Sequence, residues 1–219
     1  MGIYKGHTSP ILCCCLNWSN TLLASGSIDE AVRLWNVASG ECIAVIPAHS
    51  DPVTRVSFSK DGALLASVGY DGSCRIWDVN TCCCVHSLCH ISLVSITHLA
   101  LSARSCSIVA GTNAGALFFS ELNSDEVANI LPRKLRRLLL VSPVEFSQVI
   151  LVVTADDKEC VVWSLSEANS HVSEKHTLSN TTIYTDGDAR SADCTKDGRY
   201  LIICGKRTIH VYKAGAFGK

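Results

Sequence analysis

The sequence predicts an all-β protein made of repeated four-stranded units, and three observations support this fold class. Two stretches of the chain repeat with a fixed offset of 42 residues, so that Ser25 matches Ser67. Apolar and polar residues alternate over short runs such as 54–58, which is typical of a strand with one buried face. Pairs such as Asp61-Gly62 separate these runs, and they favour tight turns between neighbouring strands.

The repeated stretch has a defined beginning and end. The first copy begins with Gly6-His7 and ends with Trp35-Asn36; the second begins with Ala48-His49 and ends with Trp77-Asp78. A period in the low forties with a Gly-His start and a Trp-Asp end is typical of WD repeats, each of which supplies the four strands of one propeller blade. The sequence therefore predicts a WD-repeat β-propeller.

Three later copies are weaker than the first two. The third has Ala114 and Ser120 where the second has Asp and Trp, the fourth regains Asp157 and Trp163, and the fifth ends on Tyr212. We expect one domain over 1–219 with about five blades. The expected repeats are 6–47, 48–89, 90–127, 128–170 and 183–213.

Residues 166–187 do not follow the repeat pattern. This stretch is polar and lacks steady alternation, and it is interpreted as a degenerate outer strand with an extended loop. Its Asn, Ser and Thr content disfavours a helix.

Composition excludes several functional classes. The chain has 219 residues, is 47% hydrophobic and has a formal net charge of −1, so it can bury a core and offers no strong attraction to nucleic acid. No apolar run approaches the length of a membrane helix, and the N-terminal residues show neither a signal segment nor a myristoylation pattern. We expect a soluble intracellular protein that uses no cofactor.

The thirteen cysteines are interpreted as small apolar residues in a reducing compartment. No C-x-x-C pair occurs, which removes the commonest zinc and redox signals. Cys84, His86, Cys89 and His90 form a candidate metal cluster, but 81–90 aligns with the outer strand of the preceding repeat, and this structural interpretation is preferred. No metal site is predicted.

Four polar residues recur in the first two repeats, and a blade has a structural use for them. A buried tryptophan indole needs an acceptor, which a serine hydroxyl can provide while it donates to a histidine. The other histidine nitrogen can donate to an aspartate in the turn after the second strand. The predicted networks are His7, Ser25, Asp29 and Trp35, and His49, Ser67, Asp71 and Trp77. Because this Ser-His-Asp set occurs twice beside a tryptophan, we interpret it as scaffold and not as a catalytic triad.

The amino-acid sequence of the second repeat has features that are more specific than the general WD pattern. The segments 47–54, 61–62 and 70–78, together with 25–33 of the first repeat, closely resemble the WD-repeat core subunit of histone H3 lysine-4 methyltransferase complexes. The resemblance covers about 6–88. It implies a nuclear scaffold, itself no methyltransferase, that holds a catalytic partner and other subunits and accepts an arginine-containing peptide at the top of the central channel.

The peptide site implied by this resemblance falls on four residues. Tyr70 stands where the family has a tyrosine, and Thr54 where it has a small hydroxyl residue; the two phenylalanines that sandwich the arginine fall on Leu12 and Ile28. Aliphatic side chains lack the cation–π attraction of about 0.5–2 kcal/mol per ring. We therefore expect weaker and less arginine-selective peptide binding.

The resemblance also implies a seven-bladed ring, of which this chain matches the last five blades. Five blades can close as a smaller ring or form part of a larger one, and we favour a divergent or incomplete derivative of the seven-bladed ring. Arg133, Lys134, Arg136 and Arg137 are a candidate basic patch where the fourth repeat should have its Gly-His loop. The patch suits an acidic partner or nuclear import, and a merely solvated loop is its alternative.

The function expected from the sequence is a non-catalytic protein–protein interaction scaffold in a chromatin complex. Its expected location is the nucleus, with the cytoplasm as a second location, and its expected partners are protein subunits or peptides, with neither sequence-specific nucleic acid nor membrane. The alternatives are a general WD-repeat adaptor, such as a ubiquitin-ligase substrate receptor, and a propeller enzyme. No phosphate loop, metal spacing or isolated nucleophile supports an enzyme.

Overall fold

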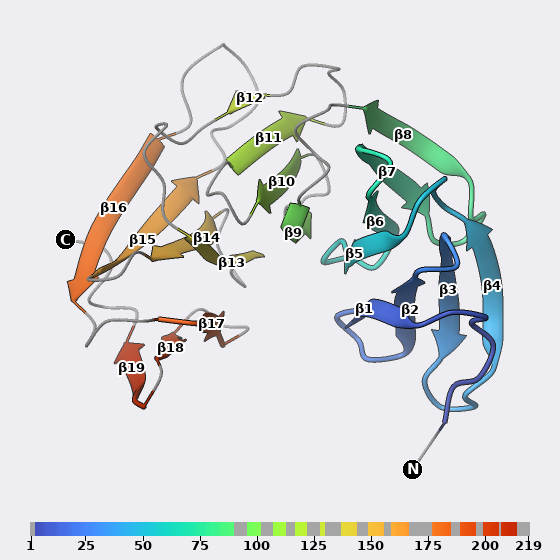
Figure 1. The fold of residues 1–219 in the computed structure, drawn as a ribbon, viewed down its shortest axis with the longest axis horizontal. Helices are drawn as coiled ribbons and strands as arrows, with labels where there is room; N and C mark the ends of the chain where they lie inside the picture. Colours follow the sequence, from blue (N-terminus) through green and yellow to red (C-terminus); the bar gives the residue numbers. More distant parts are fainter. Residues whose placement is uncertain are drawn as a thin grey trace. The chain divides into compact units, whose positions relative to one another are not determined.

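The first four-stranded sheet is built from one repeat in simple antiparallel order. Strands β1 (Ile11–Leu16), β2 (Leu22–Ser27), β3 (Ala31–Asn36) and β4 (Cys42–Pro47) pair as β1-β2-β3-β4 (Figure 1). The computed structural model describes residues 3–89, 96–101, 107–112, 117–121, 128–129, 137–143, 149–155, 159–166, 177–184, 189–195, 199–205 and 207–213. Every regular element among them is a β-strand.

The second sheet repeats the first. It contains β5 (Val53–Phe58), β6 (Leu64–Gly69), β7 (Ser73–Asp78) and β8 (Cys84–Cys89) in the order β5-β6-β7-β8. Even the irregularities recur: β1 pairs with β2 through a register shift between Ile11 and Cys13, and β5 pairs with β6 through a shift between Val53 and Arg55. Leu12 and Thr54 are therefore the extra residues of equivalent bulges.

The turns of these two sheets also share their backbone conformation. Positive φ angles occur at Asn20, Glu30 and Cys82, and at the glycines Gly40, Gly62 and Gly72. The offset of 42 pairs Asn20 with Gly62, Glu30 with Gly72 and Gly40 with Cys82. Each turn thus needs a left-handed residue, and each repeat meets the need with a different set of side chains.

The described strands of the remaining chain form three more sheets. One contains β9 (Ile96–Leu101), β10 (Ser107–Thr112), β11 (Leu117–Glu121) and β12 (Ala128–Asn129); the next contains β13 (Arg137–Pro143), β14 (Val149–Ala155), β15 (Glu159–Ser166) and β16 (Thr177–Tyr184). The last contains only β17 (Ser191–Cys194), β18 (Tyr200–Cys204) and β19 (Ile209–Lys213).

Strand β16 shows where the outer strand of the fourth sheet lies. It pairs with β15 from Glu159↔Tyr184 to Ser166↔Thr177, beyond residue 170, where the fourth repeat is expected to end. It lies within 166–187, where the sequence predicts a degenerate outer strand, and its polar sequence suits this position because an outer strand needs apolar residues on one face at most. Likewise, β12 lies just past the expected boundary at 127. The repeat boundaries themselves stay predictions.

The chain divides into two compact units, residues 1–110 with 118–128, and residues 111–117 with 129–219. In the first unit the core lies between the first two sheets. Ala24, Val32, Leu34 and Ile46 of one sheet pack in a single cluster with side chains of the other; these are Val53, Val56, Phe58, Leu65 and Trp77. The described part of the chain contains no helix with the length and hydropathy needed to span a bilayer.

Candidate functional site

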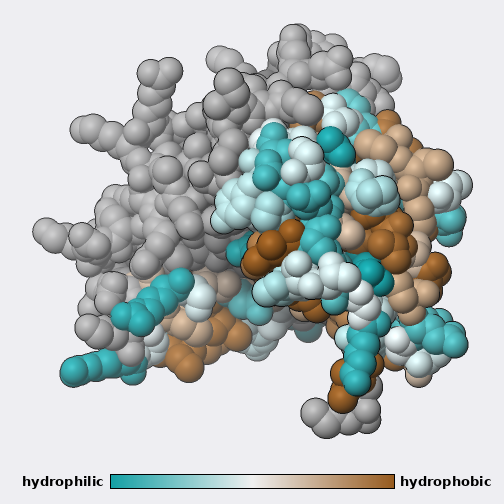
Figure 2. All heavy atoms as spheres, turned by 45° about the vertical axis from the view of Figure 1, so that its right-hand side comes forward, coloured by the Kyte–Doolittle hydropathy of each residue, from teal (hydrophilic) through white to brown (hydrophobic). Residues whose placement is uncertain are grey.

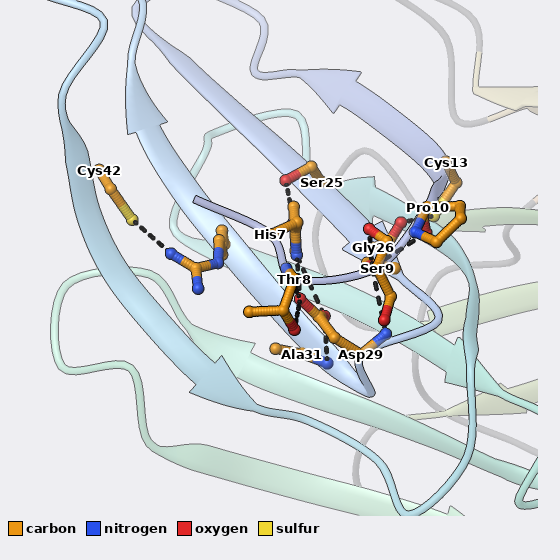
Figure 3. A network of polar contacts seen from close by, with 12 residues as sticks. His7, Thr8, Ser9, Pro10, Cys13, Ser25, Gly26, Asp29, Ala31 and Cys42 are labelled. Carbon is orange, nitrogen blue, oxygen red and sulfur yellow. Dashed lines mark hydrogen bonds and ion pairs between the residues drawn. The ribbon is translucent and has the colours of Figure 1, made fainter. Parts of the chain in front are cut away.

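The structure brings His7, Ser25, Asp29 and Trp35 together as one hydrogen-bonded chain. Figure 3 shows His7 between Ser25 and Asp29. The Trp35 indole N–H donates to Ser25 Oγ at 2.8 Å, and Ser25 Oγ lies 2.7 Å from His7 Nε2. His7 Nδ1 lies 2.9 Å from Asp29 Oδ2, so a neutral imidazole with its proton on Nδ1 satisfies every member. The segment before β1 is thereby tied to the turn after β2.

The second network repeats the first and adds one residue. Trp77 donates to Ser67 at 2.9 Å, Ser67 lies 2.8 Å from His49 Nε2, and His49 Nδ1 lies 3.0 Å from Asp71 Oδ1. In addition, the Ser73 hydroxyl donates to Asp71 at 2.7 Å. The first repeat has Ala31 at this position. The spacing of Asp71 and Ser73 could have revealed this serine, because a serine two residues after a turn aspartate can donate to its carboxylate.

Electrostatics in the second network keep the acid ionised and the base neutral. Burial favours the neutral form of Asp71, but hydrogen bonds from the Ser73 hydroxyl and backbone, with the charge that His49 carries once it is protonated in acid, outweigh it and lower the pKa of Asp71 to about 2. Burial lowers the pKa of His49 against the opposing influence of Asp71. In the first network burial likewise opposes ionisation of Asp29, while the Thr8 N–H and His7 lower its pKa.

These networks have the composition of a hydrolase triad but not its accessibility. Ser25 is 3% exposed and Ser67 is 0% exposed. Each serine hydroxyl also accepts an indole N–H, which occupies a lone pair that a nucleophile needs. The arrangement therefore acts as an internal cross-link within each sheet.

A second set of residues gathers at the end of the first unit where β1 and β5 begin. Leu12 and Thr54 occupy the two equivalent bulges, and Ile28 and Tyr70 follow β2 and β6. The Ile28 N–H donates to the Pro10 carbonyl and the Tyr70 N–H to the Pro52 carbonyl, each at 3.0 Å. These equivalent bonds place the four residues predicted for peptide contact at the same end of neighbouring sheets.

The two sheets meet closely just below this end. Cys13 Sγ lies 3.9 Å from the Val53 carbonyl oxygen, and a Cβ added to Gly26 would lie 2.6 Å from Val53 Cγ1. Only a glycine fits here without displacing the neighbouring strand. The four peptide-site residues are thus carried by two sheets in direct contact.

Apolar side chains are exposed at this end. Leu12 is 40% exposed, Ile28 42% and Tyr70 52%, while the Thr54 hydroxyl is directed inward to the Val68 carbonyl at 3.2 Å. Ile11, 52% exposed, lies beside them and is not among the predicted residues, because the bulge that shifts its register leaves no sequence signal. Figure 2 shows that apolar side chains reach the surface of the described residues among hydrophilic ones.

The other sequence-predicted features have separate outcomes. Arg133, Lys134 and Arg136 lie outside the described residues, and Arg137 is the first residue of β13. Of the candidate metal cluster, Cys84 and His86 lie in β8, where Cys84 Sγ donates to the His86 carbonyl, and His90 lies outside the described residues. Within the described part of the chain no group of three potential ligands converges.

Several cysteines lie inside the fold. Cys74 is 2% exposed, and Cys13 and Cys15 pack against the core cluster. Burial raises the pKa of the Cys13 thiol to about 11, and of Cys15 and Cys74 to about 12. These three thiols pack as apolar groups, while Cys14, Cys42, Cys83 and Cys84 are exposed.

Comparison with known proteins agrees with this geometry. The model of the family "WD domain, G-beta repeat" matches residues 1–36 and 40–78. WD repeat-containing protein 18 of Rattus norvegicus is 40% identical over 45 residues, which are 20% of this chain and 10% of that protein. Eukaryotic translation initiation factor 3 subunit I of Aspergillus oryzae is 49% identical over 45 residues, which are 20% of this chain and 13% of that protein.

A solved structure extends the similarity over nearly the whole chain. The β-propeller domain of Cps50 (Swd1) from Myceliophteria thermophila superposes with a TM-score of 0.75 at 16% sequence identity. The alignment covers 94% of this chain and 66% of that one. At this identity the match concerns the fold. The chain spans about two thirds of this solved structure. The 45-residue segment that matches the two relatives spans about a tenth of each relative's length.

Proposed function

We propose that this chain, which has the all-β fold of the WD-repeat propellers, is a non-catalytic scaffold subunit of a histone H3 lysine-4 methylation complex. WD-repeat propellers present surfaces to other proteins, and the buried serines of both Ser-His-Asp sets support a scaffold over an enzyme. The assignment to chromatin, and to the nucleus, is supported by the resemblance of about 6–88 described above.

One observation supports this proposal most directly. The bulges of β1 and β5 and the turns after β2 and β6 bring Leu12, Ile28, Thr54 and Tyr70 to one end of two sheets in contact. Bulges commonly direct a side chain toward a functional site. We propose that a partner peptide binds over these residues.

The chemistry of this end determines how an arginine peptide would bind. Of the four residues only Tyr70 offers an aromatic ring, because Leu12 and Ile28 are aliphatic and Thr54 donates inward. A guanidinium there packs against hydrocarbon and gains cation–π attraction from one ring instead of several. Arginine selectivity should accordingly be low.

Calorimetric titration with a short arginine-containing peptide and its Arg→Ala counterpart tests the site. Comparable, weak affinities are expected, and Tyr70→Ala should weaken both. Tight binding of the arginine peptide alone would reject the proposed low selectivity. Binding that Tyr70→Ala and Leu12→Ala leave unchanged would place the peptide elsewhere.

The similarity to translation initiation factor 3 subunit I favours a second assembly, since that protein is itself a subunit of a multiprotein factor. Affinity capture from nuclear and cytoplasmic extracts, followed by mass spectrometry, separates the candidates. Methyltransferase subunits are expected from the nuclear extract. Enrichment of initiation-factor subunits would favour the second assembly, and enrichment of ubiquitin-ligase subunits would favour the adaptor alternative.

A further inference from the structure

Arg55 is a positively charged residue that directly follows Thr54, one of the four peptide-site residues. It resumes the regular pairing of β5 with β6 immediately after the bulge. The offset of 42 matches it with Cys13, which follows the bulge residue Leu12 in β1. The second repeat thus carries a guanidinium where the first carries a small thiol.

Two observations locate the guanidinium of Arg55. Its Nη1 donates to the carbonyl oxygen of Thr54 at 2.9 Å. Burial raises the pKa of the Cys13 thiol to about 11, and the Arg55 charge opposes this rise. Because the interaction between charges falls with distance, the guanidinium lies near Cys13 of β1 as well as Thr54 of β5. Strands β1 and β5 are in contact (Figure 1), so this charge lies where the two strands that carry the bulges meet.

The acids that adjoin the peptide site in sequence are engaged in the histidine networks. Asp29 and Asp71 each accept from the Nδ1 atom of their histidine, and Arg75 lies 3.8 Å from Asp71. Glu30 and Asp51 are exposed and lie in loops outside the strands. Arg55 therefore supplies a positive charge within β5 itself, next to the bulge.

This charge disfavours a second guanidinium at the same place. A peptide arginine would meet a like charge, and the Thr54 carbonyl oxygen already accepts a hydrogen bond from Arg55. A carboxylate has the opposite charge, and its hydrogen bonds with a planar guanidinium are among the stronger ones in proteins. The chemistry beside the bulges thus matches an acidic side chain and not a basic one.

We propose that the partner peptide places an aspartate or glutamate carboxylate against Arg55 while its apolar residues pack on Leu12, Ile28 and Tyr70. This inference rests on the peptide site of the proposed function and names the class of ligand for that site. The chain itself supplies the guanidinium that the resemblance assigns to the ligand, and the ligand supplies the acid.

Three peptides that differ at one position test the preference. Each has nine residues, mostly small and apolar, with blocked ends that carry no charge, and its central residue is glutamate, glutamine or arginine. In calorimetric titrations of the full chain at low salt, the glutamate peptide should bind about fivefold more tightly than the glutamine peptide, as expected for one partly exposed ion pair. The arginine peptide should bind more weakly than the glutamine peptide. Added salt should narrow both differences.

Variants of Arg55 test whether this residue carries the preference. Arg55→Gln removes the charge and should abolish the difference between the glutamate and glutamine peptides. Arg55→Glu should make the arginine peptide the tightest of the three. Arg55→Lys keeps the charge and should keep the order of the three peptides, although it loses the planar donor geometry.

Lys60→Gln is the matched control. It changes the net charge by the same amount as Arg55→Gln, but Lys60 follows the opposite end of β5, where its Nζ lies 5.7 Å from the centroid of the Trp18 ring. The order of the three peptides should therefore stay unchanged. Circular dichroism checks that each variant is folded.

The possible results separate this inference from the peptide site itself. If the glutamate and glutamine peptides bind the natural chain equally and Tyr70→Ala weakens both, the acidic preference is overturned and the peptide site stands. If Tyr70→Ala weakens none of the peptides, or if none of them binds, the peptide site is rejected together with the preference. Loss of the preference in Lys60→Gln would also overturn the inference, because the preference would then follow net charge. An arginine peptide that binds most tightly would contradict the acidic preference and the low arginine selectivity alike.

Discussion

Each of the two histidine networks depends on a single carboxylate that has several donors. Asp29 accepts from His7 Nδ1, from the Thr8 N–H at 3.0 Å and from the Ala31 N–H at 3.2 Å. Asp29→Ala leaves these donors without acceptors, and we expect a loss of about 1–3 kcal/mol in the free energy of unfolding. Urea denaturation measures it. Asp29→Asn, which keeps one acceptor oxygen, should lose less, and an unchanged Asp29→Ala protein would contradict the role given to the network.

The second network predicts how stability depends on acid. The pKa of Asp71 is about 2 in the folded chain, below its ordinary value of 3.8. Its ionised form therefore contributes stability above about pH 4, and this contribution disappears as the pH falls from about 4 to 2. His49, whose pKa is lowered, adds a loss that begins as the pH falls below its ordinary value of 6.5.

Ser73→Ala isolates the serine's share of this effect. The variant should raise the pKa of Asp71, measured from the carboxyl carbon shift by NMR, and should reduce the loss of stability between pH 4 and 2. The equivalent residue of the first repeat is already Ala31, so Ala31→Ser is the matched gain of function. A Ser73→Ala protein with an unchanged Asp71 titration would show that the hydroxyl contributes nothing to ionisation.

At the scale of elements, the contact between the first two sheets depends on small residues at the crossing point. Gly26→Ala would place a Cβ 2.6 Å from Val53 Cγ1 and 2.8 Å from Cys13 Sγ. Overpacking of this kind costs about 1–3 kcal/mol, which thermal unfolding can measure. In a Val53→Ala background Gly26→Ala should cost less than in the natural chain, because the atom that is struck has been removed. Additive effects of the two substitutions would mean that the sheets do not meet there.

The later sheets should open more readily than the first two. The first two sheets each have a complete network. The third repeat has Ala114 and Ser120 at the Asp and Trp positions, the fourth has basic residues where its Gly-His loop should be, and the fifth has Tyr212 in place of the tryptophan. Without these bonds, local opening within 90–219 should need less free energy. Hydrogen exchange followed by mass spectrometry should show slower exchange for β2, β3, β6 and β7 than for the later strands. Uniform protection along the chain would contradict this expectation.

The sequence was most informative where two repeats could be compared. A fixed offset located both networks, since the same four side chains recur at the same spacing. This comparison did not identify Ser73, because the equivalent residue of the first repeat is Ala31. It did not identify the exposed Ile11, because a bulge changes which residue faces outward without changing the composition. The bounds of β16 could not be predicted from the sequence, because Thr177–Tyr184 is an outer strand with polar residues on both faces.

At the scale of the whole molecule, the distribution of thiols gives a measure of global unfolding. Cys13, Cys15 and Cys74 have raised pKa values because they are buried, so they should resist a thiolate-directed reagent at pH 8. Cys14, Cys42, Cys83 and Cys84 are exposed and should react at once. Peptide mapping after iodoacetamide pulses in increasing urea tests this order. Early labelling of Cys74 would place it outside the core.

The paired turns of the first two repeats carry a consequence for how this molecule diverged. At each of the three left-handed positions one repeat has glycine and the other has Asn20, Glu30 or Cys82. A non-glycine residue in this conformation costs about 1–2 kcal/mol, of which the stiffer unfolded chain returns a part. The two repeats therefore have the same backbone conformation at these three turn positions, although the residue types differ. Mutations at these turns can change the residue type in either repeat while the backbone keeps its left-handed conformation.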